Sequence, residues 1–360
     1  MSTVLAICFE KGAGRKTLDR CLSLLGFRGP GPDWRLHDEG LLTATVRGPM
    51  RPGTLQEIGR IPGVAWVLDR TPRASPRGSV EIGRGRRIGP PDFAVIAGPC
   101  SVESESQILK TAERVAEAGA TALRGGAFKP RTSPYSFGGL GERGLELLAL
   151  ARERTGLPVV TEVLDPAHLE AVARHADVLQ IGSRNMQNFP LLFLAGSRGA
   201  GRPVLLKRGL AATLEEFRLA AEYVRLGQIA AGGDGRAVIL CERGLRTFEH
   251  EVRYGLDVAA IPILQETTDL PVIADPSHAA GTARYVAPLA LSAVAAGADG
   301  LLVEVHADPP AAFSDREQAL DPDEFHGLMK AARAVAAARA AAGTGEPANR
   351  CGNETAGVRP

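Results

Sequence analysis

From residue 93 onward, short apolar runs rich in β-favouring residues alternate with amphipathic segments that have helical spacing. This alternation is typical of parallel strands joined by crossover helices. Eight such runs occur, and each is followed by a segment with a helical pattern. They span residues 93–97, 121–124, 158–162, 178–181, 204–207, 237–241, 272–275 and 300–304.

Eight repeats of about 30 residues make about 250 residues, the usual size of a (β/α)8 barrel, or TIM barrel. A doubly wound open sheet is the alternative α/β fold. The strand count argues against that alternative, as does the lack of a Gly-x-Gly-x-x-Gly fingerprint after the first run. We therefore predict an α/β chain whose main domain is a (β/α)8 barrel over residues 91–341.

The first 70 residues have a different pattern, with strands and helices in the order βαββαβ. Strands are predicted at 3–9, near Trp34, at 41–46 and at 64–68, with helices at 15–25 and 55–60. We expect a small α+β domain at 1–72 and a linker rich in Pro, Arg and Gly at 73–90, with a short hairpin at 79–88. The small, polar residues 342–360 are predicted to form a disordered tail.

Charge and composition exclude several classes of partner. Lys and Arg number 42 against 41 acidic residues, so the net charge of +1 gives no reason to expect a nucleic acid or a membrane surface as a partner. No apolar run approaches the ~18 residues of a membrane span, and the N-terminus lacks the pattern of a signal peptide. Five scattered cysteines suit a reducing compartment. We expect a cytoplasmic protein.

Polar residues follow all eight predicted strands, at the end of a barrel where active sites are built. A single Arg at such a position is as often solvated surface charge as part of a site, but a full set of eight is not expected by chance. The set comprises Cys100, Arg124, Lys129, Glu162, Arg184, Lys207, Arg208, Glu242, Arg243, Asp275, His278, Glu304 and His306.

Part of this set has the chemistry of a metal site. Cys100, His278 and Glu304 follow strands one, seven and eight, which become neighbours when a barrel closes. A thiolate, an imidazole and a carboxylate suit one Mn, Fe, Co or Zn ion better than Mg or Ca. Asp321, at the start of the last helix, is a candidate fourth ligand, although an Asp before Pro is equally typical of a helix N-cap.

The rest of the set is cationic, although the whole chain is almost neutral. Arg provides a fork that matches phosphate and carboxylate oxygens, and Lys provides a point charge. We therefore expect anionic substrates at the barrel mouth. The cationic residues are Arg124, Lys129, Arg131, Arg184, Lys207, Arg208 and Arg243.

These residues lie in longer strings that resemble a known family, the type I 3-deoxy-D-arabino-heptulosonate 7-phosphate (DAHP) synthases, in their beta subgroup with an N-terminal ferredoxin-like domain. The resemblance covers about residues 93–341. The strings are Ala97-Gly-Pro-Cys-Ser-Val-Glu103, Leu123-Arg-Gly-Gly-Ala-Phe-Lys-Pro-Arg-Thr-Ser-Pro-Tyr-Ser-Phe137, Ile181-Gly-Ser-Arg-Asn-Met-Gln-Asn188, Cys241-Glu-Arg-Gly-Leu-Arg-Thr-Phe-Glu249, Asp275-Pro-Ser-His278 and Val303-Glu-Val-His306.

The resemblance implies an enzyme that condenses phosphoenolpyruvate with erythrose 4-phosphate and water, releasing phosphate, at the start of the shikimate pathway to aromatic amino acids. The family's metal ligands fall on Cys100, His278, Glu304 and Asp321. Phosphoenolpyruvate is expected at Arg124, Lys129, Arg184, Lys207 and Arg243. Erythrose 4-phosphate is expected at Pro130, Arg131, Thr132 and Ser133.

Relatives on the same fold are alternatives. The 3-deoxy-D-manno-octulosonate 8-phosphate and sialic acid synthases also add phosphoenolpyruvate to a sugar aldehyde, but the octulosonate enzymes have an Asn-Arg-Ser-Ser type of loop where this chain has Lys129-Pro-Arg-Thr132. A metal-dependent hydrolase would use more than one His ligand. A non-catalytic binding barrel is disfavoured because the ligand positions and this loop are intact.

The mechanism implied is attack of C3 of phosphoenolpyruvate on an aldehyde polarised by the metal ion, followed by addition of water at C2 and loss of phosphate by C–O cleavage. Lys129, Glu162 and His278 are predicted to take part in the reaction. Glu162 either orients or deprotonates the water, or it is a counter-ion for Lys129 or Lys207. His306 is a candidate for supporting the metal ligands from outside their shell.

The N-terminal domain matches the family only in the order of its elements. In the family such domains bind tyrosine or phenylalanine and close over the barrel mouth, so the resemblance implies feedback inhibition by an aromatic amino acid. The alternative is a scaffold that aids oligomerisation. Relatives are commonly tetramers, so a homotetramer is expected.

Overall fold

The computed structural model describes residues 2–29, 31–37, 40–48, 50–51, 53–69, 77–129 and 135–342. The predicted tail, from residue 343 onward, and residues 73–76 of the predicted linker lie outside these ranges. Within the described part of the chain, no helix is long and apolar enough to cross a membrane.

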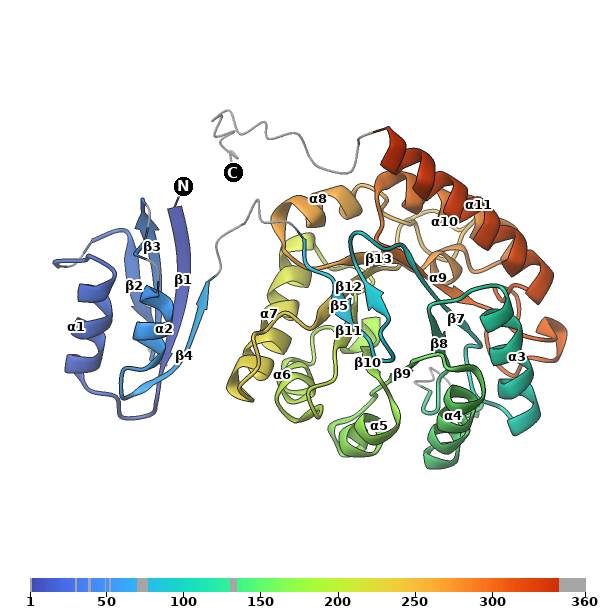
Figure 1. Cartoon of the computed structure of the whole chain (residues 1–360), viewed down its shortest axis with the longest axis horizontal. Coiled ribbons are helices and arrows are strands. Elements are labelled where there is room, and N and C mark those ends of the chain that lie inside the picture. Colours follow the sequence, from blue (N-terminus) through green and yellow to red (C-terminus); the bar gives the residue numbers. More distant parts are fainter. Residues whose placement is uncertain are drawn as a thin grey trace.

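The N-terminal unit, blue in Figure 1, has the predicted order of elements. Its four strands form one antiparallel sheet in the order β2-β3-β1-β4. Alternating apolar residues of the strands, including Leu5, Ile7 and Leu42, are buried with Ile58 of the second helix. The elements are β1 (Ser2–Phe9), α1 (Arg15–Leu24), β2 (Trp34–His37), β3 (Leu41–Arg47), α2 (Thr54–Gly59) and β4 (Val64–Asp69).

The main domain is a closed barrel of eight parallel strands, which confirms the predicted barrel. All eight strands coincide with the predicted apolar runs to within about one residue at most ends. Their residues are mostly buried on both faces, as expected when helices cover the outside of a parallel sheet. The strands are β7 (Ala94–Gly98), β8 (Ala122–Arg124), β9 (Val159–Glu162), β10 (Val178–Ile181), β11 (Val204–Lys207), β12 (Val238–Glu242), β13 (Val272–Ala274) and β14 (Gly300–Glu304).

Helices form the outer layer around these strands (Figure 1). Several begin at residues that cap free backbone N–H groups, such as Thr213, which forms a capping box with Glu216. The α-helices are α3 (Glu105–Glu117), α4 (Glu142–Thr155), α5 (Leu169–His175), α6 (Phe189–Arg198), α7 (Leu214–Ala230), α8 (Ala260–Thr267), α9 (Pro276–Ala280), α10 (Ala283–Ala296) and α11 (Pro322–Ala341), and the short 3-10 helices are η1 (Pro166–His168), η2 (Ser183–Asn185) and η3 (Pro309–Ala311).

The hairpin expected within the linker is present as β5 (Val80–Glu81) and β6 (Arg87–Ile88). Its apolar residues Val80, Ile82 and Ile88 belong to the same buried cluster as the residues that fill the barrel interior. The hairpin therefore closes the amino-terminal end of the barrel. The part of the predicted linker from residue 77 to 90 is thus a component of the barrel, because burial of these three side chains attaches it there.

Candidate active site at the carboxyl ends of the strands

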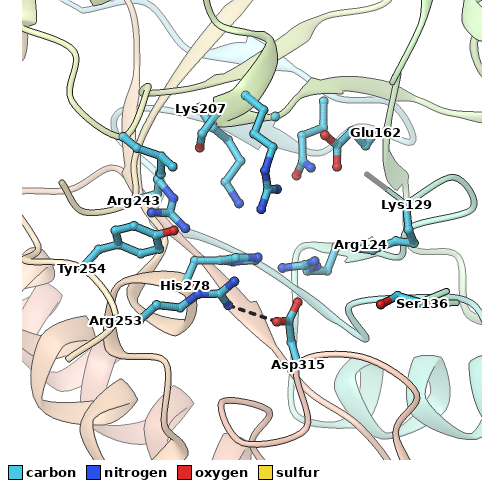
Figure 2. Close-up of a pocket in the computed structure, with 15 residues that line it drawn as sticks. Arg124, Lys129, Ser136, Glu162, Lys207, Arg243, Arg253, Tyr254, His278 and Asp315 are labelled. Atoms are coloured by element: carbon cyan, nitrogen blue, oxygen red, sulfur yellow. Dashed lines mark hydrogen bonds and ion pairs between the residues drawn. The ribbon is translucent and has the colours of Figure 1, made fainter. Parts of the chain in front are cut away.

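A pocket of ≈ 290 Å³ opens at the carboxyl ends of the strands, at the lower end of the usual size of small-molecule sites. Two of its lining residues are acidic, Glu162 and Asp315. Six lining residues are cationic, so the positive charge predicted at the barrel mouth is concentrated in this pocket. Figure 2 shows the lining side chains around one space. The cationic lining residues are Arg124, Lys129, Arg184, Lys207, Arg243 and Arg253.

A cluster of potential metal ligands lies at one side of the pocket. Ligand atoms of Cys100, Glu304 and Asp315 lie within 4.8 Å of one another. Cys100 Sγ donates to Asp315 Oδ2 over 2.9 Å and is 2.9 Å from the Nζ of Lys129. β7 and β14 pair with Glu304 opposite Gly98, so barrel closure itself brings the thiol and this carboxylate together, as the strand order predicted.

His278 lies beside this cluster, in the short helix α9 that follows β13. Its Nε2 is 3.4 Å from Glu304 Oε1, and its Nδ1 is 2.8 Å from Asp275 Oδ2. Burial lowers the pKa of His278 despite the nearby carboxylates, which favours the neutral imidazole that binds metals. Asp275 thus contacts the ring with Oδ2, while its Oδ1 caps α9 by accepting from the backbone N–H of His278.

Asp321, the predicted fourth ligand, lies outside this cluster. It is the N-cap of α11, where its Oδ1 accepts from the backbone N–H groups of Asp323 and Glu324 and a full capping box forms. Asp315 occupies the place expected for Asp321. Of the two roles considered for Asp321, the structure shows the helix N-cap, since its carboxylate accepts from the free N–H groups at the start of α11.

Sequence reasoning missed Asp315 because the loop between β14 and α11 contains several Asp residues and no periodicity that ranks them. The backbone of Asp315 has φ +52°, a left-handed conformation that Asp tolerates better than most residues. Burial opposes ionisation of Asp315, but His278, Cys100, Arg253 and Lys129 hold its pKa below the usual range. A charged carboxylate is thus held against the thiol.

Cys100 is buried, which raises the pKa of its thiol to about 12, although the Lys129 cation opposes this shift. A thiol in this environment keeps its proton unless a stronger cation replaces it, so a metal ion would bind with release of that proton. The donor set of one sulfur, one imidazole nitrogen and two carboxylates fits a borderline divalent ion. The residues present therefore fit a metal site.

Arg124 ends β8 and is buried between the metal cluster and the pocket. Its Nη2 is 3.1 Å from Glu304 Oε1, while its Nη1 is buried without a hydrogen-bond partner among the described residues. The neighbouring strand β7 ends in a glycine, Gly98, with φ +149°, and a Cβ there would collide with the carbonyl oxygen of Arg124. A buried guanidinium with one free N–H group indicates an anion site.

The other predicted cations take different positions around the pocket. Lys207 is buried and forms an ion pair with Asp275. Arg243 lies with its Cζ 4.1 Å from the centre of the Tyr254 ring, and its Nε has no partner within the described structure. Burial lowers the pKa of Arg243, yet a guanidinium stays charged at neutral pH. Arg184 is exposed at the rim.

Arg208, which we expected at the mouth, does not line the pocket. Its Nη1 donates to Glu242 Oε2 and to Asp257 Oδ2, both over 2.8 Å, and its Nε donates to the carbonyl oxygen of Ala212. Two carboxylates therefore balance the charge of Arg208. Glu242, which we also expected at the strand ends, is one of them and does not line the pocket. We predicted Arg208 at the mouth because it directly follows Lys207 at the end of β11. Successive side chains in a strand point to opposite sides, so Arg208 points away from the pocket that Lys207 lines.

Glu162 lines the pocket at the end of β9, opposite the metal cluster. A Cβ added at Gly182 would collide with Glu162 Oε1, so glycine at this position leaves room for the carboxylate. The predicted erythrose 4-phosphate residues Pro130, Arg131, Thr132 and Ser133 lie outside the described part of the chain.

His306 does not face the metal cluster. Its Nδ1 accepts from the backbone N–H of Asp308 over 3.0 Å, and its Nε2 is 3.6 Å from Glu103 Oε2. Sequence reasoning also missed Arg253, Tyr254 and Ser136, which line the pocket from loops. Loop residues carry no periodic signal that would place them at a strand end.

The chain was compared with known families and proteins. Residues 72–338 match the DAHP synthetase I family. A phospho-2-dehydro-3-deoxyheptonate aldolase of Thermotoga maritima is 49% identical over 259 residues, which are 72% of each chain. A 2-dehydro-3-deoxyphosphooctonate aldolase of Bordetella petrii is 32% identical over 66% of this chain and 88% of its own length.

Solved structures give the same result. The crystal structure of the DAHP synthase of Thermotoga maritima matches with a TM-score of 0.70 and 37% identity, covering 94% of this chain and 98% of that one. A truncated form of the 3-deoxy-D-arabino-heptulosonate 7-phosphate synthase from the same organism matches with a TM-score of 0.66 and 44% identity, over 73% of this chain and 93% of the other.

Proposed function

Because this chain belongs to the DAHP synthetase I family, we propose that it condenses phosphoenolpyruvate with erythrose 4-phosphate and water to give 3-deoxy-D-arabino-heptulosonate 7-phosphate and phosphate, the first step of the shikimate pathway. The enzyme is a transferase. Identity to the heptonate aldolase of Thermotoga maritima is 49%, against 31 to 35% for the octonate aldolases compared. This difference supports the four-carbon sugar over arabinose 5-phosphate.

The observation that carries this proposal is the set of cations in the pocket, two of which have unused N–H groups. Arg124 Nη1 and Arg243 Nε are buried and lack partners within the described residues. Buried donors of this kind are costly unless a ligand satisfies them. Phosphoenolpyruvate carries a phosphate and a carboxylate, and therefore offers enough oxygens for both guanidinium groups and for Lys207 and Lys129.

We also propose that Cys100, His278, Glu304 and Asp315 hold one divalent ion, with Mn, Fe, Co and Zn as candidates. When bound, the ion would supply Lewis acidity for the aldehyde of erythrose 4-phosphate. The protein's own groups bind and orient the substrates. Arg124 lies between the metal cluster and the anion site, so its charge keeps the two substrates close to each other.

The assay is release of phosphate from phosphoenolpyruvate in the presence of erythrose 4-phosphate, arabinose 5-phosphate or N-acetylmannosamine. We expect turnover with erythrose 4-phosphate alone, lost on chelation and restored by Mn²⁺. Turnover with arabinose 5-phosphate instead would favour the octulosonate alternative. Absence of turnover with all three would favour the non-catalytic barrel.

Glu162 is our candidate for orienting or deprotonating the water that adds at C2. The alternative is a counter-ion role toward Lys129, because the negative charge of Glu162 contributes to the raised pKa of the Lys129 ammonium group. For the water role, Glu162→Gln should lower kcat by about 100-fold or more, the usual contribution of a general base, with little change in the KM for phosphoenolpyruvate. Steady-state phosphate release measures both quantities.

Gly182 gives an independent way to test the same carboxylate. A Gly182→Ala change should displace Glu162 and lower kcat by about 10-fold or more. If it acts through Glu162, the double variant should be no slower than Glu162→Gln alone, because the effects are not additive for residues in contact. Full activity in Glu162→Gln would contradict the role in water activation, and additive losses in the double variant would show that Gly182→Ala does not act through Glu162.

We further propose that the N-terminal unit is a ferredoxin-like regulatory domain that binds an aromatic amino acid. Support comes from the strand order β2-β3-β1-β4 and from a pocket of ≈ 890 Å³ beside the start of α1. This pocket combines the apolar rings of Phe9 and Trp34 with the charge of Arg15, which suits an aromatic ring and a carboxylate.

At saturating tyrosine or phenylalanine we expect phosphate release to slow several-fold. Arg15→Ala should weaken this inhibition, because it removes one of the two cations that line the pocket, Lys11 and Arg15. Rates unchanged by tyrosine, phenylalanine and tryptophan would favour the scaffold alternative. We also propose that the chain belongs to the beta subgroup, assembles as a homotetramer and is located in the cytoplasm.

A further inference from the structure

A buried carboxylate outside the pocket joins the loop after β7 to the connection between β14 and α11. Glu103 follows β7, and its side chain is only 5% exposed. Its Oε1 accepts from Ser101 Oγ and from the backbone N–H of Phe313, each over 2.9 Å. Its Oε2 is 3.6 Å from Nε2 of His306. None of these atoms lines the substrate pocket.

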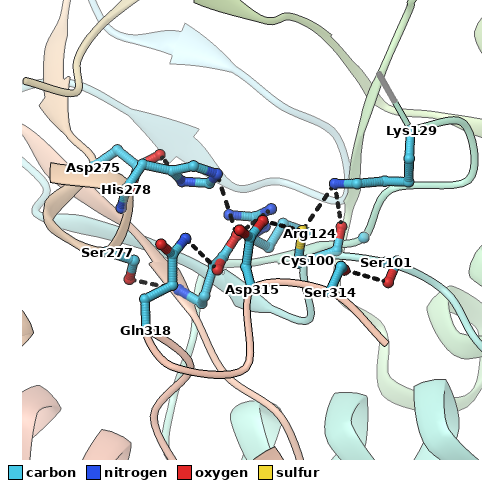
Figure 3. A network of polar contacts seen from close by, with 12 residues as sticks. Cys100, Ser101, Arg124, Lys129, Asp275, Ser277, His278, Ser314, Asp315 and Gln318 are labelled. Carbon is cyan, nitrogen blue, oxygen red and sulfur yellow. Dashed lines mark hydrogen bonds and ion pairs between the residues drawn. The ribbon is translucent and has the colours of Figure 1, made fainter. Parts of the chain in front are cut away.

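Each of these contacts lies close in sequence to a residue of the metal cluster. Ser101 is next to Cys100, Phe313 is two residues before Asp315, and His306 is two residues after Glu304. The Ser101 hydroxyl also makes a 2.6 Å hydrogen bond with Ser314 Oγ, which Figure 3 shows beside the cluster. The carboxylate therefore joins the three chain segments whose side chains meet at the proposed metal.

Asp315 is the member of the cluster that most needs such support. Cys100 and Glu304 follow directly from neighbouring strands, whereas Asp315 lies in the irregular loop between η3 and α11 and has a left-handed backbone. Asp315 also pairs with Arg253, whose side chain is 37% exposed and whose Nη1 donates to Asp315 Oδ1 over 3.0 Å. Glu103 attaches the same loop through a buried contact at Phe313.

We propose that Glu103 is the positioning residue that holds the loop of Asp315 against the thiol of Cys100. The proposal rests on the metal site proposed above. Glu103 accepts hydrogen bonds from the segment of the thiol and from the segment of the carboxylate. Its loss therefore removes one of two buried connections between these segments, the other being the hydrogen bond between Ser101 Oγ and Ser314 Oγ. Supporting groups of this kind typically change metal affinity about 10- to 100-fold.

The test is metal binding by the full-length protein, measured without substrate. Co²⁺ is titrated into the metal-free protein, and the sulfur-to-metal charge-transfer absorption reports formation of the thiolate contact. Glu103→Ala should weaken Co²⁺ binding about 10- to 100-fold. Glu103→Gln keeps an oxygen acceptor for Phe313 and should stay within about threefold of the wild type.

Two further variants separate positioning from general stability. Ser314→Ala removes one hydroxyl of the connection and should weaken Co²⁺ binding by a few-fold without unfolding the loop. Glu105→Ala is the matched control, because Glu105 lies two positions further on and is exposed. Among the described residues it pairs only with the exposed Arg143, over 3.5 Å. It should bind Co²⁺ like the wild type. Thermal melting of each metal-free variant reports stability separately.

Co²⁺ affinity within twofold of the wild type in both Glu103→Ala and Ser314→Ala would overturn the proposal. A lower melting temperature of metal-free Glu103→Ala with unchanged Co²⁺ affinity would also overturn it, since a purely structural role predicts that result. Failure of the wild type to bind Co²⁺ would instead disprove the metal site itself. If Glu103→Ala does not fold, weaker Co²⁺ binding by Ser314→Ala, compared with Glu105→Ala, supports the proposal, and equal binding refutes it.

Discussion

An Asp315→Asn variant should lose about 100-fold or more in kcat/KM for phosphate release, whereas Asp321→Asn should stay within about twofold of the wild type. Asp315 provides a carboxylate oxygen to the cluster with Cys100 and Glu304, and loss of that charge weakens a Lewis acid site by several kcal/mol. Asp321 caps α11, a role in which asparagine is equally suitable. Steady-state phosphate release by all three proteins at the same Mn²⁺ concentration measures this difference.

Metal content after dialysis provides the second measurement for these two variants. Asp315→Asn should retain less Mn²⁺ than the wild type, and Asp321→Asn should retain the same amount. Asp321→Ala is a useful third variant, because loss of the cap should lower the free energy of unfolding by about 0.5–2 kcal/mol while metal binding persists. If Asp321→Asn lost the metal and Asp315→Asn kept it, the original sequence prediction would be correct.

Arg124→Lys should lower kcat/KM for phosphoenolpyruvate by about 100-fold even though the charge is kept. One terminal nitrogen of Arg124, Nη2, lies 3.1 Å from Glu304 Oε1. The other, Nη1, has no partner among the described residues and can bind an anion. A single ammonium group cannot occupy both places. Loss of a buried, charge-assisted contact of this kind costs about 2–5 kcal/mol.

Arg208→Lys is the matched control for this change. Arg208 is also buried, but its guanidinium is used by Glu242 and Asp257 and does not line the pocket. The variant should lower the free energy of unfolding, measured by urea denaturation, with the KM for phosphoenolpyruvate within about twofold. A wild-type kcat/KM for Arg124→Lys would exclude an anion-binding role for Arg124, and equal rises in KM in both variants would show that the effect is not local.

The periodic part of the chain was predictable. Each barrel strand is a short apolar run that must be covered on both faces, so the sequence pattern located all eight strands of the closed barrel. Residues at the ends of those strands, such as Cys100, Lys207 and Glu304, follow directly from that register. The sequence also indicated the hairpin at 79–88 but not its burial, because its three apolar residues have no partner until the barrel closes.

Residues in loops were decided by the tertiary structure. Asp315 and Asp321 lie in the same connection and carry the same carboxylate, and the sequence offers no rule that ranks them. The fold turns Asp315 toward Cys100 and uses Asp321 for the first N–H groups of α11. Arg208 and Lys207 are likewise adjacent cations with opposite directions, one held by Glu242 and Asp257 and the other facing the pocket.

The sequence by itself thus determined the barrel, its strand ends and the anionic character of the substrates, because these depend on periodicity and on residue type. Only the tertiary structure decided which of several similar charged side chains, such as Asp315 and Asp321, lie in contact with the site. An ion pair or a metal cluster depends on distances of a few ångströms between atoms far apart in the chain. Those distances are set by loop conformation and side-chain packing, which leave no periodic pattern in the sequence.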